Sequence, residues 1–310
     1  MVSRANASRA PSVAPWIRPR HSNSPYTSIS RYYTRSVLIT RRGALKGALY
    51  TAIGGLTGAV SYGVAYERHR IGVTEATLPF HGLPPAFDGL RVALLTDVHH
   101  SALVSADDVS SAVELALSTQ PDLIVLGGDY VTYGDRGFVE PVAELLSKLH
   151  APNGVFAILG NHDDDREMPT ALTKRGITVL RDQRTRIVVR GDALEIAGIR
   201  FWTRKPADIA KVLKGADDPV LLLAHDPRRL AEAAVLNIPA VLSGHTHGGQ
   251  VVLPGVGAIA RARFPVVEGL GQREKSSIFV SRGIGTVYVP VRINCPPEVA
   301  LVTLQRQSST

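Results

Sequence analysis

Five short motifs place Asp, Asn and His side chains in patterns that suit metal coordination. They contain seven candidate ligands: Asp97, His99, Asp129, Asn161, His225, His245 and His247. Oxygen and imidazole groups without thiolate suit Mn, Fe, Zn, Co or Ni, and they argue against Cu(I) and iron–sulfur centres. Seven protein ligands exceed what one catalytic metal keeps, because a reactive metal must leave positions for water and substrate. The residues therefore predict two divalent cations that share a carboxylate.

Each motif follows a short apolar run that is typical of a buried strand. The runs are Leu90–Thr96, Leu123–Leu126, Val155–Leu159, Val220–Ala224 and Ala240–Leu242. Amphipathic periodicity predicts helices between them, at residues 105–119, 139–149 and 227–236. Apolar strands that alternate with helices predict an α/β fold whose sheet is covered by helices. Because ligands bind at the carboxyl ends of strands in such sheets, we expect the motifs to converge.

The net charge of +8 belongs to the N-terminal segment rather than to the body of the chain. Residues 1–66 carry nine Lys and Arg and no Asp or Glu, which leaves 26 basic and 27 acidic residues for the rest. A body this neutral lacks the clustered basic face that nucleic-acid binding requires, so nucleic acid is not an expected partner. The single cysteine, Cys295, permits no intrachain disulfide, which fits a cytoplasmic protein or one that folds before export.

The N-terminal part divides into three segments by composition. Residues 1–36 are rich in Ser, Arg and Pro without hydrophobic periodicity, which predicts a disordered basic leader. Residues 37–66 resemble a twin-arginine export signal, because Arg41 and Arg42 follow a Thr and precede an apolar residue and a Lys. The departure is an Ala in that motif where Phe is commoner. Residues 67–89 are interrupted by Pro and Gly, and they predict a linker and an edge strand.

The uncharged stretch after the paired arginines, residues 48–66, has two readings. As a helix its 19 residues span about 28 Å, just enough to cross a bilayer. Its Gly, Ser and Thr content is more typical of an export signal than of a permanent membrane helix, but no clean cleavage site follows, so an uncleaved membrane anchor also fits. We expect the bacterial cell envelope as the location, periplasmic or on the outer face, with the twin-arginine machinery as export partner. Alternatives are an inner-membrane association that faces the cytoplasm, an organellar transit peptide, and a later translation start.

Together, the motifs D-x-H, G-D, G-N-H-D, a single His and G-H-T-H resemble those of the calcineurin-like metallophosphoesterase superfamily over residues 88–305. The triplet 248–250 and the tail segments 281–285, 290–292 and 297–299 are similar to one branch of it. That branch holds twin-arginine-exported or membrane-attached phosphodiesterases, including enzymes similar to UDP-2,3-diacylglucosamine pyrophosphatases. The resemblance implies a four-layer αββα sandwich, in which two mixed β-sheets are flanked by helices, with a catalytic domain over residues 90–305.

The resemblance also implies a role for each ligand candidate. Three residues would hold the first metal: Asp97, His99 and His247. Three others would hold the second: Asn161, His225 and His245. Asp129 would bridge the two metals. The chain departs from the family pattern after this residue, at Tyr130–Tyr133, which affects a substrate-orienting contact sometimes made there but not the metal bridge.

Four further residues are implied in catalysis or substrate binding. His162 would face the leaving-group oxygen as general acid or transition-state donor. Asp163 would orient that imidazole or remain a solvated loop carboxylate. Arg282 and Arg292 would clamp a substrate phosphate with their planar guanidinium groups, or form surface salt bridges.

The implied activity is hydrolysis of phosphoester or diphosphate bonds by direct attack of a metal-bridging hydroxide. The cofactors would be two divalent ions such as Mn, Fe or Zn, and the substrate a phosphodiester or diphosphate, lipid-linked or UDP-linked. Three alternatives stay open: a phosphomonoesterase or protein phosphatase, a nuclease, and an inactive binding module with the same fold.

Overall fold

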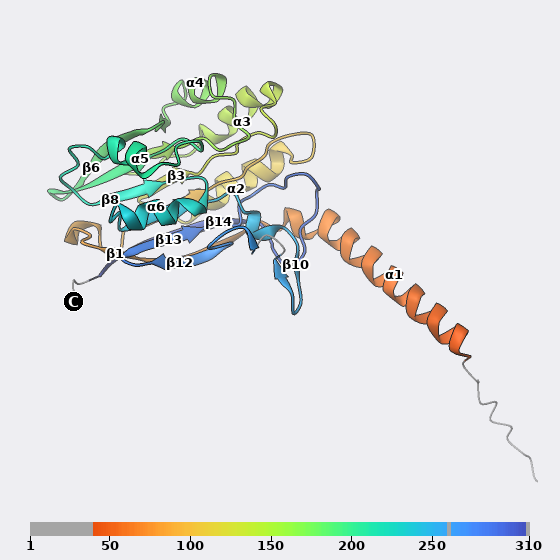
Figure 1. Cartoon of the computed structure of the whole chain (residues 1–310). Coiled ribbons are helices and arrows are strands. Elements are labelled where there is room, and N and C mark those ends of the chain that lie inside the picture. The colour runs from red at the N-terminus through yellow and green to blue at the C-terminus, as the bar shows by residue number, and fades with distance from the viewer. Residues whose placement is uncertain (1–39, 259–261, 308–310) are drawn as a thin grey trace, which may run out of the picture. The chain divides into compact units, whose positions relative to one another are not determined.

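The computed structural model describes residues 40–258 and 262–307. The chain divides into two compact units, Met1–Ala48 and Leu49–Thr310. The expected disordered leader, residues 1–36, lies outside the described residues. All the described sheets belong to the second unit (Figure 1). All the candidate site residues also belong to the second unit.

Strand β2 (Arg91–Leu95) illustrates how the sequence sets the architecture. Its side chains alternate between the two faces of the sheet, and the last four are fully buried. Ala93 and Leu95 pack in a core with helices, whereas Val92 and Leu94 pack against the opposite sheet. Because both faces of the strand are covered, both must be apolar, and the strand is therefore a continuous apolar run.

The first sheet contains six strands in the order β1-β14-β2-β3-β4-β5. The bounds of the other five are β1 (Gly72–His81), β3 (Leu123–Leu126), β4 (Val155–Ala157), β5 (Thr178–Val179) and β14 (Glu298–Gln307). Strand β14 runs antiparallel to β2, and all other neighbours in this sheet are parallel. Strand β1 lies at an edge of the sheet, where the sequence predicted an edge strand.

The second sheet also contains six strands, in the order β12-β13-β9-β8-β7-β6. Their bounds are β6 (Gln183–Val189), β7 (Asp192–Gly198), β8 (Val220–Leu223), β9 (Ala240–Ser243), β12 (Gly269–Arg273) and β13 (Ser276–Val280). The two outer pairs are antiparallel and the inner pairs are parallel. A separate ribbon pairs β10 (Val252–Leu253) with β11 (Gly257–Ala258).

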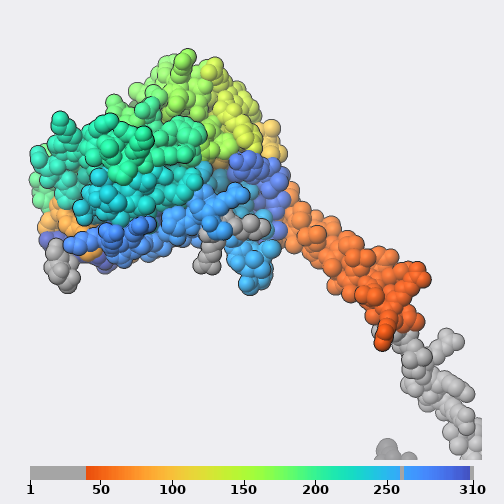
Figure 2. All heavy atoms as spheres, in the orientation of Figure 1, coloured from red at the N-terminus to blue at the C-terminus, as the bar shows by residue number. Residues whose placement is uncertain are grey.

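Helices cover the outer face of each sheet. The first sheet packs against α2 (Ala106–Ser118), α3 (Val139–Leu146) and α4 (Glu167–Thr173). The second packs against α5 (Pro206–Val212) and α6 (Leu230–Val235), whose side chains and loops form a continuous turquoise surface in Figure 2. A third apolar core lies between the two sheets. This sequence of layers confirms the predicted four-layer αββα sandwich with two mixed sheets.

Two of the predicted helices differ from the observed ones at their ends. Helix α3 ends at Leu146 rather than at residue 149. The helix expected at 227–236 begins as a 3-10 turn, Pro227–Arg229, in which the Asp226 side chain accepts a bond from the Arg228 N–H, and α6 follows. Further 3-10 turns are Glu67–His69, Pro85–Phe87, Arg136–Phe138 and His247–Gly249.

Helix α1 (Arg41–Ala65) contains the paired arginines at its first two positions. Its side chains are mostly exposed, and Gly63 is its buried residue. Among the residues that the structure describes, no helix combines the length and the apolar character that crossing a membrane requires.

Candidate metal centre

The five motifs follow strands from both sheets. In the first sheet the neighbouring parallel strands β2, β3 and β4 precede the motifs of Asp97, Asp129 and Asn161. In the second sheet the parallel strands β8 and β9 precede the motifs of His225 and His245. Parallel neighbours end at the same edge of a sheet, so the two sets of loops face one another at one end of the sandwich.

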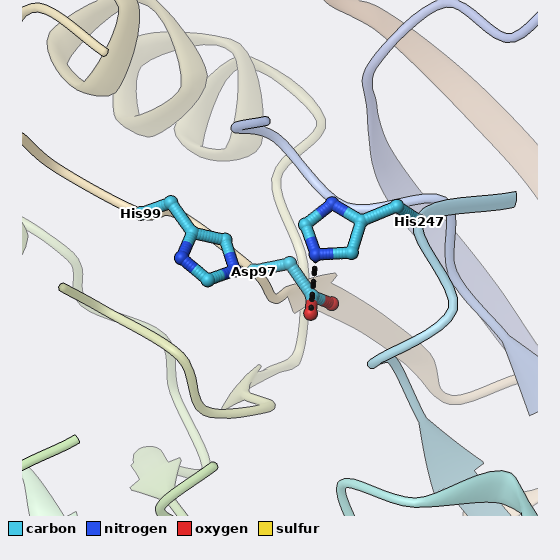
Figure 3. A group of neighbouring side chains, drawn as sticks. All are labelled: Asp97, His99 and His247. Atoms are coloured by element: carbon cyan, nitrogen blue, oxygen red, sulfur yellow. Dashed lines mark ion pairs between the residues drawn. The ribbon is translucent and has the colours of Figure 1, made fainter. Parts of the chain in front are cut away.

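The six candidate ligands that are Asp or His form two clusters, and Asn161 lines the same cavity as Asp129, His245 and His247. One contains Asp97, His99 and His247, and the other contains Asp129, His225 and His245; within each cluster the ligand atoms lie within 4.8 Å of one another. Figure 3 shows the first cluster, in which Nε2 of His247 lies 3.4 Å from Oδ1 of Asp97. These distances suit coordination of one cation per cluster.

The Asp129 carboxylate faces both clusters. Its Oδ2 lies 3.1 Å from Nε2 of His225 and 3.6 Å from Nε2 of His99, which belong to different clusters. Its Oδ1 accepts a 2.8 Å bond from the His162 backbone N–H. Oδ1 of Asp129 is therefore engaged by a backbone N–H, while Oδ2 lies between the imidazoles of His99 and His225.

Four polar atoms of the candidate ligand residues are buried and have no hydrogen-bond partner among the described residues: Nε2 of His99, Oδ1 of Asn161, Nε2 of His225 and Nδ1 of His247. Burying a polar atom without a partner is unfavourable. A cation beside the carboxylates would supply the missing partner, and the N/O donor set suits borderline divalent metals. The residues present therefore fit a pair of divalent cations.

Neighbouring groups aim the ligands. Nδ1 of His225 donates to the Gly127 carbonyl at 2.7 Å, so in the neutral imidazole the lone pair lies on Nε2, the atom that faces Asp129. Nδ1 of His99 lies 3.1 Å from the Thr132 hydroxyl. Oδ2 of Asp97 accepts bonds from the Thr96 hydroxyl and the His245 backbone N–H, at 2.8 Å and 3.0 Å. The sequence did not predict that Thr96 and Thr132 contact the ligands, because hydroxyl residues are common beside such motifs.

The backbone around the ligands is held in unusual conformations. Five of the candidate ligands have positive φ values between 49° and 73°: Asp97, His99, Asp129, His245 and His247. Non-glycine residues rarely adopt this region, and they concentrate at functional sites. Close approach also requires glycine, because a Cβ at Gly160 would overlap the Asp129 carboxylate and one at Gly244 would overlap Asp97.

Burial and mutual interaction shift the acidities of the ligands. Burial lowers the pKa of His99 and of His245 to about 4. Burial also lowers the pKa of His225, but the carboxylates of Asp129 and Asp97 outweigh it and raise this pKa to about 10. Burial raises the pKa of Asp97 to about 6, whereas the neighbouring imidazoles hold the pKa of Asp129 below its ordinary value against its burial. In the metal-free protein a proton on His225 therefore balances the Asp129 charge.

His162 lies beside the clusters, with its ring centroid 5.0 Å from that of His99 in an edge-on arrangement. Its Nδ1 accepts a 3.1 Å bond from the Tyr133 backbone N–H. An imidazole nitrogen that accepts carries no proton, so the proton of the neutral ring lies on Nε2. His162 is thereby set up as a hydrogen-bond donor through Nε2.

Asp163 differs from the sequence-based expectation. It was expected to orient the His162 imidazole or to be a solvated loop carboxylate, but it accepts bonds of 2.7–2.9 Å from the backbone N–H groups of Asp129, Tyr130 and Gly160. Burial and the nearby Asp129 charge raise its pKa to about 7. Asp163 therefore ties together the two loops that carry Asp129 and Asn161.

The phosphate clamp expected of Arg282 and Arg292 is wrong. The Arg292 side chain is fully buried, and its guanidinium donates to four backbone carbonyls: those of Arg282, Gly283, Gly285 and Cys295. Arg282 forms a 2.5 Å ion pair with Glu298. Neither arginine lines the cavity beside the clusters. Both hold the tail segment, whose residues Ile284 and Gly285 donate to the carbonyls of Thr96 and Asp97.

A cavity of about 420 Å³ opens beside the two clusters. It is lined by ligand candidates, His162 and a rim that sequence reasoning missed: Gln250, Arg263, Phe264, Val287 and Tyr288. The rim comes from loops far apart in the sequence, which no local pattern connects.

Comparison with known proteins agrees with this geometry. A family model for calcineurin-like phosphoesterases matches residues 90–249, which include every candidate ligand. The metallophosphoesterase YkuE of Bacillus subtilis (strain 168) is 33% identical over 280 residues, covering 86% of this chain and 98% of that protein. The phosphodiesterase YaeI of Escherichia coli (strain K12) is 33% identical over 227 residues, covering 69% and 82%. A transmembrane protein with a metallophosphoesterase domain from Bos taurus is 29% identical over 291 residues, covering 86% and 64%.

Metal affinity is expected to depend on pH through His225. Its pKa of about 10 means that the imidazole is protonated at neutral pH, and a metal must displace this proton. Affinity should therefore rise about tenfold per pH unit between about pH 7.5 and 9, while His99 and His245, already neutral, add no slope. Titration of the metal-free protein against a chelator of known affinity measures this slope. A constant affinity over that range would contradict it.

Replacement of Arg292 should destabilise the protein. Arg292→Lys keeps a charge but cannot reach four carbonyls at once, so we expect a loss of about 2–4 kcal/mol in the free energy of unfolding. Urea denaturation at fixed metal concentration measures it, with the exposed Arg186→Lys as the matched control. Equal losses in the two variants would argue against a special role for the buried guanidinium.

Proposed function

The chain belongs to the calcineurin-like phosphoesterase family and is a metal-dependent phosphoester hydrolase, and from this premise we propose that it hydrolyses phosphodiesters at the paired clusters. The observation that carries the proposal is the position of Asp129, whose Oδ2 faces His99 and His225 at once. The Escherichia coli relative is named a phosphodiesterase, which supports this substrate class.

In this proposal each cluster binds one divalent cation. Asp97, His99 and His247 would hold the first cation, and His225 and His245 would hold the second together with Asn161, whose Oδ1 is buried without a partner. Asp129 would be shared by the two cations, because its Oδ2 faces both clusters while its Oδ1 accepts a bond from the His162 N–H. When bound, two cations would supply the Lewis acidity that activates water for attack on phosphorus, and they would offset the negative charge of the phosphoryl oxygens.

In this proposal, side chains of the protein position the substrate and protonate its leaving group. His162, whose Nδ1 accepts from the Tyr133 N–H, donates from Nε2 to the oxygen that leaves phosphorus. Asp163 acts as a positioning residue, because its bonds to three backbone N–H groups fix the loops of Asp129 and Asn161. Arg263 lines the cavity and offers a positive charge to a phosphate or diphosphate.

The proposal extends to diphosphates, including lipid-linked or UDP-linked ones, because the same attack on phosphorus cleaves them. A monoesterase or nuclease would use the same centre, and the near-neutral body of 26 basic and 27 acidic residues beyond residue 66 favours a small substrate over nucleic acid. An inactive binding module would have no need of all seven ligand candidates and His162.

We also propose that residues 37–66 direct the chain to the cell envelope, as an export signal or anchor. Two features support this assignment: Arg41 and Arg42 precede an uncharged stretch, and the Bos taurus relative is named a transmembrane protein. Changing both arginines to Lys and fractionating cells tests it. An unchanged envelope location in this variant would count against the twin-arginine route.

The enzymatic proposal is tested by metal analysis of purified protein and hydrolysis of bis-p-nitrophenyl phosphate with added Mn²⁺, Fe²⁺ or Zn²⁺. Two metal ions per chain with metal-dependent turnover would support it. Protein that binds no metal and shows no turnover would leave the inactive binding module.

Asp129→Asn should remove turnover and weaken retention of both metals, because a neutral amide bridges two cations poorly. The loss in kcat/KM should exceed the roughly 10–100-fold that replacing a supporting residue costs. Metal content and phosphodiesterase rates measure the two effects. Normal turnover with two bound metals would exclude the shared carboxylate.

His162→Ala should keep both metals and lower kcat by about 10²–10⁴-fold, the usual scale for removing a proton donor. The loss should be smaller for a leaving group that departs without a proton, such as p-nitrophenolate, than for an alkyl alcohol. Loss of bound metal in this variant would instead identify His162 as a ligand.

A further inference from the structure

Two exposed tyrosines stand beside His162. The side chains of Tyr133 and Tyr288 are large and aromatic, yet these residues are 67% and 74% exposed. Their ring centroids lie 5.0 Å and 6.4 Å from that of His162 and 6.1 Å from each other. Tyr133 comes from the loop after β3 and Tyr288 from the segment between β13 and β14, so only the tertiary fold pairs them.

Tyr133 is fixed to His162 through the backbone. Its N–H donates to Nδ1 of His162, and the N–H of Gly134 donates to the His162 carbonyl at 2.7 Å. The φ of Tyr133 is 53°, in the left-handed region that bulky residues avoid. These contacts hold the backbone of Tyr133 beside His162.

Tyr288 is fixed by a tight turn. The Val289 N–H donates to the Val287 carbonyl at 2.7 Å, which closes a three-residue turn around Tyr288 with a φ of 64°. Such a turn with positive φ at its centre is rare and strained. The buried Gln250 side chain bonds both the N–H and the carbonyl of Val287, at 2.7 Å and 3.1 Å. Gln250 follows the His247 loop, so Tyr288 is positioned relative to the metal ligands.

Neither ring gains stability from burial, yet both are held in strained backbone conformations at the site. Strain that persists without a packing gain points to a role in binding. Exposed aromatic faces at fixed positions suit stacking on a planar ring, since aromatic pairs favour offset or edge-on contacts at such distances. Tyr288 and His162 both line the cavity beside the clusters, so a ring stacked there is continuous with the phosphate site.

We propose that Tyr133 and Tyr288, the tyrosine pair, bind a planar ring of the substrate, such as the base of a nucleotide, and thereby select ring-bearing phosphoesters. This inference rests on the proposed function for the position of the phosphate, and it adds the class of group attached to it.

Binding of three phosphate compounds to the manganese-loaded protein tests the inference by calorimetry. Adenosine 5′-monophosphate and ribose 5-phosphate share the phosphate and the sugar, and n-octyl phosphate carries an alkyl chain instead. We expect the nucleotide to bind about tenfold more tightly than ribose 5-phosphate, as base stacking predicts. In the double variant Tyr133→Leu/Tyr288→Leu this preference should fall to less than about twofold, with the ribose 5-phosphate affinity nearly unchanged.

Two control variants keep the test specific. Tyr288→Phe retains the ring and should retain the preference. Trp202→Leu removes another aromatic side chain of similar exposure, 66%, which does not line this cavity, and should also retain it. Equal manganese content and thermal unfolding of the variants establish that the fold is intact, and the two single Leu variants serve if the double variant does not fold.

Three results would overturn the inference: no preference in the wild type, a preference that survives in the double variant, or an octyl phosphate affinity that depends equally on the tyrosine pair. Because binding needs no turnover, a protein that shows the preference but does not hydrolyse bis-p-nitrophenyl phosphate would contradict the proposed function alone.

Discussion

The main constraint on the structure is a group of buried carboxylates and imidazoles that lack enough hydrogen-bond or ion-pair partners within the protein. Asp97 and Asp129 are fully buried or nearly so, and they face the imidazoles of two histidine clusters. Removing carboxylates from water is costly unless an opposite charge accompanies them. Without metal, a proton on His225 supplies part of that charge, while His99 is left with an unpartnered nitrogen. Two divalent cations would satisfy all these groups at once.

The ligands are spread over loops from two sheets, and the packing of these sheets compensates for the unfavourable burial and backbone strain at the site. Apolar cores lie on the outer and inner faces of both sheets, so the strands themselves are fixed by burial. The loops beyond the strand ends are then free to adopt positive φ values at five ligands. Strain at the site is thus compensated by packing elsewhere, and glycines such as Gly160 and Gly244 admit the close approach of the carboxylates.

A second group of buried contacts holds the tail segment against the site. Arg292 ties together four carbonyls of residues 282–295, and this segment in turn bonds to the backbone beside Asp97. The same segment continues to Tyr288 at the rim of the cavity. The chain between β13 and β14 therefore links the candidate metal ligands to the rim of the cavity. Arg292, which the sequence analysis interpreted as a phosphate-binding residue, donates to backbone carbonyls of the protein instead.

The sequence by itself determined the ligand types and the five strands that precede the ligand motifs, whereas the order of layers was implied by the family resemblance. The strands and ligand types follow from local patterns: a short continuous apolar run predicts a strand such as β2, and the residues after it carry the Asp and His groups. Only the tertiary structure decided which oxygen of Asp129 faces the histidines, that Asp163 binds backbone N–H groups, and that Arg292 is buried. It also decided the pairing of Tyr133 with Tyr288, whose loops lie far apart in the chain. The orientation and burial of a side chain depend on neighbours that are distant in sequence, and local periodicity carries no information about them.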